Sequence, residues 1–405
     1  MNLIEVKSQV QKREFLNLPK KLFKNDPNWI CPLDADVEAV FDPQKNVFFT
    51  HGICTRWILQ DGWGNTIGRI ATFIDYKKSD TFAQPTGGIG FFDCINNRKA
   101  AHLMFDHARE WLMKRGMEAM DGPVNFGEND KFWGLLVKGF TPPSLGMNYN
   151  PAYYEEFFRS YGFEKLFDQL TNFLDATRPM PDRFNKIADW VMKKPGYRFE
   201  HFTQKNKEKF FRDFQEIYND AWTVFENFTP IELPTIEESF RQMRPVMDEK
   251  IIWFAYYKDE PIAFIVCLPD VNQILRHVNG KLDLFGKLKF LWYKKTKAVN
   301  RLRIIIMGCK KKYTNHGIES ALIRSLGNVV LPRQTIKGVE LAWVGDFNSK
   351  MMAIHEATGA QLDKVHRTYR YLFNKKELAF TVNEPACVER AASRTQTYNG
   401  GFSTN

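Results

Sequence analysis

A basic turn that leads into a helix is the segment whose residue types best fit a chemical role. Three lysines, at positions 310–312, follow an apolar run and precede Gly317, after which a helical pattern begins. The first N–H groups of a helix lack partners within the helix, and the helix dipole adds partial positive charge there. The turn therefore predicts a binding site for an anionic group such as a phosphate.

The elements that must position this turn recur in two similar halves of the chain. In the first half we expect strand 3–6, helix 8–23, strands 53–59, 67–74 and 89–95, helix 98–115, strand 117–124, helix 153–161 and strand 166–174. The second half repeats this order as strand 198–202, helices 207–222 and 236–247, strands 251–257, 261–268 and 301–307, helix 317–331, strand 339–344, helix 349–358 and strand 362–373. A repeat of about 175 residues predicts a duplicated domain.

The predicted fold class is α/β with mixed sheets, in two tandem domains. We expect the domains to span 1–175 and 196–373, with a helical linker at 176–195 and a tail at 374–405. The tail is polar and rich in small residues, so its end should be frayed.

The composition favours a globular cytoplasmic protein with a large core. The chain is 44% apolar and 15% aromatic, yet no run reaches the ~18 apolar residues needed to cross a bilayer. The N-terminus, residues 1–6, lacks the apolar core of a signal peptide. The 6 cysteines show no C-x-x-C spacing, which favours reduced thiols over a metal site or disulfides; a catalytic cysteine is the alternative.

Positive charge is concentrated in one stretch. Residues 276–303 hold nine Lys or Arg against one acid, Asp283, a net charge of +8 out of +10 for the whole chain. A nucleic-acid-binding face should be broader than this, so we expect no nucleic-acid partner.

The element order and the turn together resemble the GNAT superfamily of N-acyltransferases. Residues 314–319 match the family's donor-binding turn, although only the central glycine, Gly317, is retained. The run from Asn348 to Gly359 resembles a second family pattern, with His355 where the family often has a tyrosine. A bacterial group of tandem GNAT proteins that includes the bacterial ceramide synthases shares finer features, at residues 27–29, 46–51, 122–126, 134–140, 269–272 and 340–343.

This resemblance implies an acyltransferase without a permanently bound cofactor. A long-chain fatty acyl group would pass from acyl-CoA, or from an acyl carrier protein, to an amine, with a sphingoid base as the favoured acceptor. The alternatives are a Fem-type aminoacyl transferase and a non-catalytic acyl-CoA or lipid sensor. The implied donor site consists of Met307, Gly308, Lys310, Lys311, Lys312, Asn315, His316, Gly317, Ile318 and Asn348.

Four side chains are candidates for the chemistry of acyl transfer, each with a plainer alternative. Glu340, inside an apolar run, suits a general base, or is a carboxylate paired with a nearby lysine. Asp346 faces the cleft or caps the next helix. His355 protonates the leaving thiolate or is structural. Asp270 binds the acceptor or marks a turn.

Other features bear on the two substrates. Glu319 stands where the family has Gly or Ala and would repel a pyrophosphate, which favours a carrier-protein donor or a displaced CoA. Asn272, Asn125, Phe126 and Tyr149 are candidates for substrate binding. Asn272 would bind the acceptor, and Phe126 and Tyr149 would line an acyl channel, with core packing as the alternative for these two aromatic residues.

The basic stretch also bears on where the protein acts. Residues 282–295 mix large apolar residues with lysines, which predicts contact of about 276–303 with an anionic inner-membrane surface, or an ordinary helix with solvated lysines. The first half has no glycine in its corresponding turn, 96–100, so we expect it to have lost donor binding and to shape the acceptor side.

Overall fold

The computed structural model describes residues 1–374 except 80, 130, 224–229 and 297–298. The expected tail beyond 374, with Cys387, therefore lies outside the described residues, as does Lys297 of the basic stretch. The chain forms two compact units, each assembled from separate segments. Among the described residues, unit 1 comprises the segments within 1–169, 274–292 and 364–374, and unit 2 those within 170–273 and 293–363.

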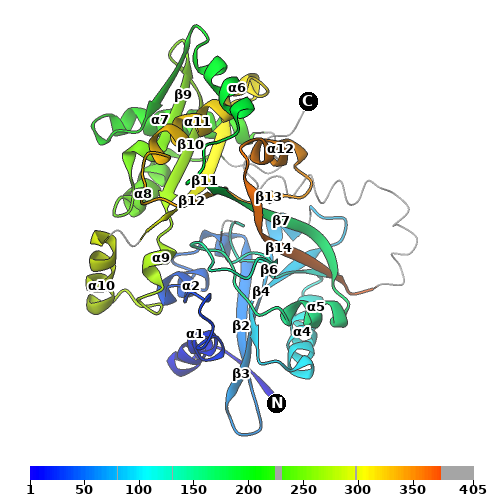
Figure 1. Cartoon of the computed structure of the whole chain (residues 1–405). Coiled ribbons are helices and arrows are strands. Elements are labelled where there is room, and N and C mark those ends of the chain that lie inside the picture. The colour runs from blue at the N-terminus through cyan, green and yellow to red at the C-terminus, as the bar shows by residue number, and fades with distance from the viewer. Residues whose placement is uncertain (80, 130, 224–229, 297–298, 375–405) are drawn as a thin grey trace. The chain divides into compact units, whose positions relative to one another are not determined.

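Unit 1 contains most elements of the first half (Figure 1). They are β1 Asn2–Glu5, α1 Gln9–Leu22, α2 Asp34–Val40, η1 Val47–Thr50, β2 Gly52–Gln60, β3 Thr66–Asp75, α3 Tyr76–Ser79, β4 Thr86–Cys94, α4 Arg98–Met113, β5 Ala119–Gly122, β6 Leu135–Lys138 and α5 Tyr154–Tyr161.

Unit 2 contains most elements of the second half. They are α6 Asp182–Met192, β8 Tyr197–His201, η2 Gln204–Asn206, α7 Lys207–Trp222, α8 Leu233–Met243, η3 Glu249–Ile251, β9 Ile252–Tyr257, β10 Glu260–Pro269, β11 Arg301–Cys309, η4 Lys311–Tyr313, α11 Ile318–Val330, β12 Gly338–Glu340, β13 Val344–Gly345 and α12 Ser349–Ala357. Four elements have residues in both units: β7 Glu164–Asp175, α9 Asn272–Leu275, α10 Leu284–Lys295 and β14 Gln361–Leu372.

Both units are built on mixed sheets, which confirms the predicted α/β fold class. In unit 1 the strand order is β1-β2-β3-β4-β5-β14, and only β4 and β5 are parallel. In unit 2 the order is β7-β12-β11-β10-β9-β8, and only β11 and β12 are parallel. The last strand of each half thus pairs within the other unit: β14 with β5, and β7 with β12.

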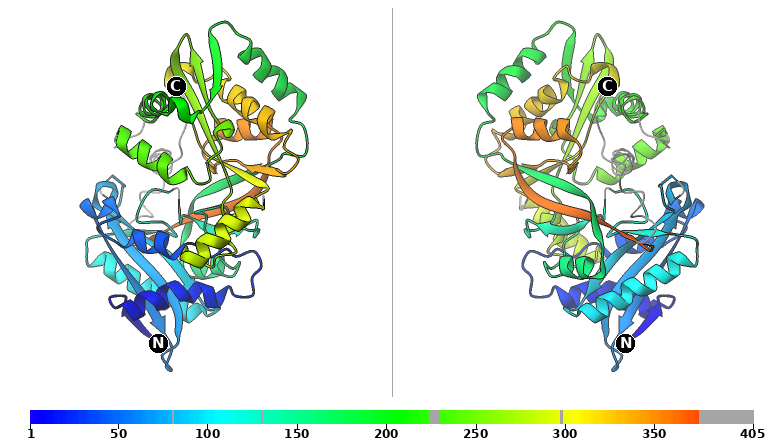
Figure 2. Two further views of the ribbon diagram at one scale, coloured as in Figure 1. Left: turned by 90° about the vertical axis from the view of Figure 1, so that its left-hand side faces the viewer. Right: turned by 90° about the vertical axis from the view of Figure 1, so that its right-hand side faces the viewer.

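Helices cover both faces of each sheet. In unit 1, α4 lies across β3 and β4 and shares a core with α5, whereas α1 and α2 bury Phe15 and Val37 in a second core (Figure 2). In unit 2, α6 and α11 share one core, and α7 and α8 form another that is rich in phenylalanine. The apolar faces at 3–4 residue spacing account for this arrangement.

Two segments expected as connections, the predicted helical linker and the insertion, contain helices. The segment expected as a linker contains α6, whose Phe184 and Val191 are buried in the core of unit 2. The insertion between β10 and β11 contains α9 and α10. Among the described residues, no helix is long and apolar enough to cross a membrane.

Candidate active site

The strands β11 and β12 run side by side for a short distance and then part. Their parallel pairing begins with Arg301 beside Gly338 and ends with Arg303 beside Glu340. Strand β12 stops there, while β11 continues to Cys309. Within the described chain that edge of β11 has no strand partner beyond Arg303, so its backbone groups are available to a substrate.

A β-bulge bends β11 in the unpaired stretch. On its other side, Ile304 pairs with Cys267 and Ile306 with Val266, which leaves Ile305 between them. Ile305 is 38% exposed on an otherwise largely buried strand. Bulges bend a strand locally and are common next to functional sites.

Gly308 is required for packing. A Cβ at this position would lie 2.7 Å from Cζ3 of Trp222 and 3.1 Å from Cε1 of Phe264. Trp222 stacks on Tyr218 with ring centroids 4.4 Å apart. The close approach that the glycine permits is therefore made by an aromatic side chain of α7.

The lysines of the turn differ in their availability to a ligand. Lys310 is buried, and its Nζ lies 2.5 Å from Glu216 Oε1 and 3.1 Å from Glu260 Oε1. Lys311 is exposed, and its backbone N–H donates to Asp220 Oδ1 at 2.8 Å. Lys312 is exposed and 3.7 Å from Glu260. The charge of Lys310 is thus balanced by acids of α7 and β10, and Lys311 and Lys312 carry the accessible charge.

The turn ends in two left-handed residues before the helix begins. Asn315 has φ 68° and Gly317, the N-cap of α11, has φ 76°. The N-cap glycine supplies no side-chain cap, so the first N–H groups of α11, from Ile318 onward, keep the geometry of an anion site. His316 is exposed and its Nδ1 lies 3.5 Å from the Tyr197 hydroxyl.

Glu319 occupies the first turn of α11 with its side chain turned inward. It is 3% exposed, and its Oε1 has no hydrogen-bond partner among the described residues. Burial raises the pKa of Glu319, opposed by a hydrogen bond from its own backbone N–H and then by the charges of Lys350 and His316. A raised pKa favours the neutral acid, which reduces the repulsion of a phosphate that an ionised carboxylate at this position would cause.

Two buried ion pairs lie where β11 and β12 part. Arg301 Nη2 donates to Asp270 Oδ2 at 2.6 Å, and Arg303 Nε lies 3.2 Å from Glu340 Oε1. Both carboxylates are almost fully buried. Burial raises the pKa of Asp270; Arg301 opposes this shift, and the charge of Glu340 adds to it. Glu340 is therefore buried and lies beside an arginine of β11.

The segment after β12 supplies three more of the predicted residues. Asn348, not Asp346, is the N-cap of α12, since its side chain accepts from the N–H of Met351 at 3.1 Å. Asp346 is half-buried in the preceding turn. His355 is buried, with Nδ1 3.0 Å from Nδ2 of Asn172 on β7.

Burial has a direct consequence for the chemistry of His355. It lowers the pKa of His355 to about 4, so the imidazole is neutral at pH 7. A neutral ring can hydrogen-bond but holds no imidazolium proton to give to a thiolate. The lowered pKa and the contact with Asn172 favour a positioning role for His355 over the proton-donating role expected above.

The predicted substrate-binding residues are divided between the two units. Asn272 is buried in unit 2, and its N–H donates to Asp270 Oδ1 at 3.2 Å, close to the ion pairs. In unit 1, Phe126 is 1% exposed and packs against Phe73 in the core. Asn125 is half-buried, and its Oδ1 has no hydrogen-bond partner among the described residues. Phe126 is thus a core residue.

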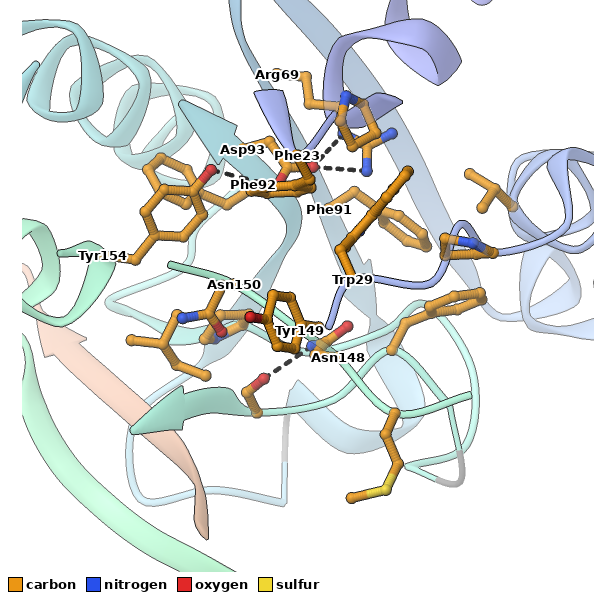
Figure 3. A pocket seen from close by; sticks show the side chains of 18 of the residues that line it. Phe23, Trp29, Arg69, Phe91, Phe92, Asp93, Asn148, Tyr149, Asn150 and Tyr154 are labelled. Atoms are coloured by element: carbon orange, nitrogen blue, oxygen red, sulfur yellow. Dashed lines mark hydrogen bonds and ion pairs between the residues drawn. The ribbon is translucent and has the colours of Figure 1, made fainter. Parts of the chain in front are cut away.

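Tyr149 lines a cavity of unit 1 (Figure 3). Its hydroxyl donates to Asp26 Oδ2 at 2.7 Å. The buried pair of Arg69 and Asp93, 2.7 Å apart, lies in the same wall. The cavity volume of about 70 Å³ is room for roughly five water molecules, so in this form it does not accommodate a long acyl chain.

The two units share the register of their diverging strands. In unit 1, β4 and β5 are parallel from Thr86 beside Ala119 to Gly88 beside Asp121, after which β4 continues to Cys94. In β11 and β12 of unit 2, likewise, three parallel residue pairs precede the point where the strands part. The turn after β4 differs, because the side chain of Asn97 accepts from the N–H of Ala100 and closes the start of α4.

Several residues of the site were missed from sequence. Arg301 and Arg303 counted there only as part of a basic stretch, although two arginines at alternate positions of a strand share one face and can serve buried acids. Asn172 had no signal, because its partner His355 lies 183 residues away.

Comparison with known proteins agrees with this geometry. No protein-family model matches the chain. A bacterial ceramide synthase of Caulobacter vibrioides is 29% identical over 386 residues, which cover 91% of this chain and 97% of that protein. Protein YghO of Escherichia coli K12 is 28% identical over 365 residues, or 88% and 92% of the two chains.

A solved structure establishes the fold. A tandem GNAT protein from the clavulanic acid biosynthesis pathway has a TM-score of 0.53 with this chain, covering 93% of it and 99% of that structure at 12% identity. The chain therefore has the tandem GNAT fold, and the predicted resemblance to the bacterial ceramide synthase group is confirmed.

Proposed function

We propose that this tandem GNAT protein is an N-acyltransferase that moves a long-chain fatty acyl group from a thioester to the amine of a sphingoid base or a similar lipid amine. The observation that carries the proposal is the open edge of β11, which lies between the helix-terminus anion site of α11 and the buried pair of Arg303 and Glu340. The similarity to a ceramide synthase over nearly its whole length supports the acceptor class.

The reaction proceeds by direct attack in a ternary complex. The amine nitrogen bonds to the thioester carbon, the C–S bond breaks, and the thiolate leaves with its electron pair. One proton leaves the attacking nitrogen and one reaches the thiolate. Backbone N–H groups on the open edge of β11, near Met307 and Gly308, would stabilise the oxygen as negative charge develops on it.

We assign the proton-accepting role to Glu340. Its carboxylate lies at the point where the strands part, and Arg303 Nε, 3.2 Å away, supplies a counter-charge. Asp270 and Asn272 would position the acceptor beside it. His355 acts through Asn172 as a positioning residue. Asp346, the first residue after β13, is the other acid of this segment that could accept a proton.

The donor binds at the turn before α11. Lys311, Lys312, His316 and the backbone from Asn315 to Ile318 would hold a phosphate group, with Asn348 fixing the neighbouring helix. Lys310 is excluded from this set, because two acids already balance its charge. One phosphate suits this turn better than a pyrophosphate, because Glu319 takes up space in the first turn of α11 where the family has Gly or Ala. An acyl carrier protein is therefore the preferred donor and acyl-CoA the second.

A lipid acceptor also sets where the enzyme works. Long-chain amines partition into bilayers, so the proposal includes contact with an anionic membrane surface, at the cytoplasmic face of the inner membrane. Within the predicted stretch 276–303 this contact would be made by α10, since Arg301 and Arg303 are paired with buried acids. A non-catalytic acyl-thioester sensor is the second candidate function. The internal pairing of Lys310 and the presence of Glu319 make this turn differ from the family's donor site, so donor binding without productive transfer is the alternative.

Mass spectrometry of reaction products tests the proposal. Purified protein is incubated with palmitoyl-CoA or palmitoyl carrier protein and, separately, sphinganine, 3-ketosphinganine, glycine, serine and a polyamine. We expect an N-acylated long-chain base. An N-acylated product from a small amine alone would refute the lipid acceptor. Donor binding without any amide product would identify the sensor.

A further inference from the structure

Helix α10 exposes its apolar face. Five large side chains are 57% to 75% exposed: Leu284, Phe285, Leu288, Leu291 and Trp292. Their spacing of i, i+1, i+4, i+7 and i+8 places them in one arc of about 120° on a helix that turns 100° per residue. A continuous apolar stripe of this kind, turned to solvent, is the reverse of the usual arrangement in a globular protein.

Lysines border the stripe on both sides. By the same helical geometry, Lys287 lies on one side and Lys289 on the other, and both are exposed. Lys294 lies on the same side as Lys287, but its Nζ donates to the carbonyl of Pro245. The opposite side of the helix faces the protein, where Gly286 is buried and Tyr293 half-buried. The stripe is thus framed by positive charge in the plane that a membrane surface would occupy.

Acidic side chains do not interrupt this face. Asp283 is the only acid between 276 and 296, and its Oδ1 accepts the Gly286 N–H at 2.8 Å at the start of the helix. Its negative charge therefore lies at the N-terminal end of the helix, where it interacts favourably with the helix dipole.

The segment before α10 is firmly attached to unit 1. Ile274 and Leu275 are buried, and the Asp34 N–H donates to the carbonyl of Gly280 at 2.8 Å. Arg276 Nη2 donates to the carbonyl of Pro27 at 3.2 Å. These contacts present α10 in a defined orientation, so insertion of its stripe would need no ordering of a loose arm.

We propose that α10 lies in the plane of an anionic phospholipid surface, with its apolar stripe at the level of the acyl-chain boundary and Lys287 and Lys289 among the headgroups. We assign this surface to a membrane because its apolar residues match the acyl-chain layer of a leaflet, and the lysines on both sides match the anionic headgroup layer. The functional reason for this contact rests on the proposed function, in which the enzyme collects a poorly soluble amine from the bilayer.

Vesicle flotation with the full-length protein and no substrate tests this inference. The probes are vesicles of phosphatidylcholine alone and of phosphatidylcholine with 30% phosphatidylglycerol. We expect binding to the anionic vesicles, weaker binding to the neutral ones, and loss of about fivefold in partition coefficient for each of Lys287→Gln and Lys289→Gln. The triple variant L284S/L288S/L291S should lose at least about 100-fold.

Matched controls separate the stripe from general hydrophobicity. Trp63 is 89% exposed on the turn between β2 and β3, so Trp63→Ser should bind vesicles as the wild type does, whereas Trp292→Ser should bind less. Because the changed residues are exposed, all variants should keep the wild-type Tm. Retention of wild-type binding by the triple variant, or absence of binding by the wild type, overturns the inference.

Two further readouts distinguish the other occupants and the proposed function. A wild-type dimer in light scattering that the triple variant abolishes would show that the stripe is a self-interface, which also overturns the inference. If the activity exists, the triple variant should keep turnover of a short-chain, water-soluble amine and lose turnover of an acceptor supplied in vesicles. Vesicle binding without any turnover would leave the membrane surface standing and reject the acyltransferase.

Discussion

The pair of Arg303 and Glu340 allows a catalytic role to be separated from a structural one. The Glu340 side chain is 1% exposed and that of Arg303 13% exposed. Changing Glu340 to Gln leaves the buried guanidinium without its counter-charge, and breaking a buried pair in this way costs about 3 kcal/mol. At roughly 2–4 °C per kcal/mol for a unit of this size, Tm should fall by about 6–12 °C.

The double variant E340Q/R303Q removes both charges. Replacing a whole buried pair is close to neutral, so its Tm should return to within about 4 °C of the wild type. Turnover should not return. Loss of a positioned general base costs roughly 10²- to 10⁴-fold in kcat, and neither glutamine can accept the amine proton.

The assay combines thermal unfolding followed by circular dichroism with thiol release from the donor. R303Q alone should lose stability and retain more turnover than E340Q, because the carboxylate is still present. Recovery of both stability and turnover in the double variant would refute the assignment of Glu340 as the base, since it would show that the pair only supports the fold.

Three more predictions follow from single residues. His355 has a pKa lowered by burial to about 4, so its contribution to stability is present above pH 6.5 and lost as pH falls from 6.5 to 4. The loss is about 3 kcal/mol, measured as the urea midpoint against pH, and His355→Gln should abolish it while His316→Gln, at an exposed position, should not. Burial raises the pKa of Glu319, so stability linked to its neutral form is lost as pH rises through that pKa. Glu319→Gln should therefore be more stable than the wild type at pH 8, with a lower KM for acyl-CoA, whereas Glu356→Gln on the exposed side of α12 should change neither. Gly308→Ala should destabilise unit 2 by about 1–3 kcal/mol, because its Cβ would lie 2.7 Å from Trp222; Gly62→Ala, with no atom within 4 Å of the added Cβ, is the control, and equal Tm values for the two would contradict the packing argument.

The sequence predicted the order of elements well, because periodicity is a local property. The hairpin of β9 and β10, the helix after the basic turn and the duplication were all expected from apolar spacing. The length of β12 was not. Residues 339–344 read as one strand, but β12 stops at Glu340, and beyond it the N–H of Leu341 donates to the carbonyl of Asn172, next in the register with β7. That partner belongs to a distant strand, and no local pattern signals it.

The partners of charged side chains likewise could not be predicted from the sequence. Lys310 was expected to serve a phosphate, yet it is buried against Glu216 and Glu260, 94 and 50 residues away in the chain. Only the folded arrangement of α7 and β10 brings these acids to the turn. The stripe on α10 is the opposite case: its spacing is visible in the sequence, but only the structure tells which way it faces.

Product formation by the wild-type protein tests the central claim most directly. Purified enzyme, palmitoyl thioester and sphinganine are mixed, and released thiol is measured together with N-palmitoyl product by mass spectrometry. The proposed mechanism predicts one amide for each thiol released and no acylated protein. Thiol release without amide, or no reaction with either the CoA or the carrier-protein donor, would contradict it.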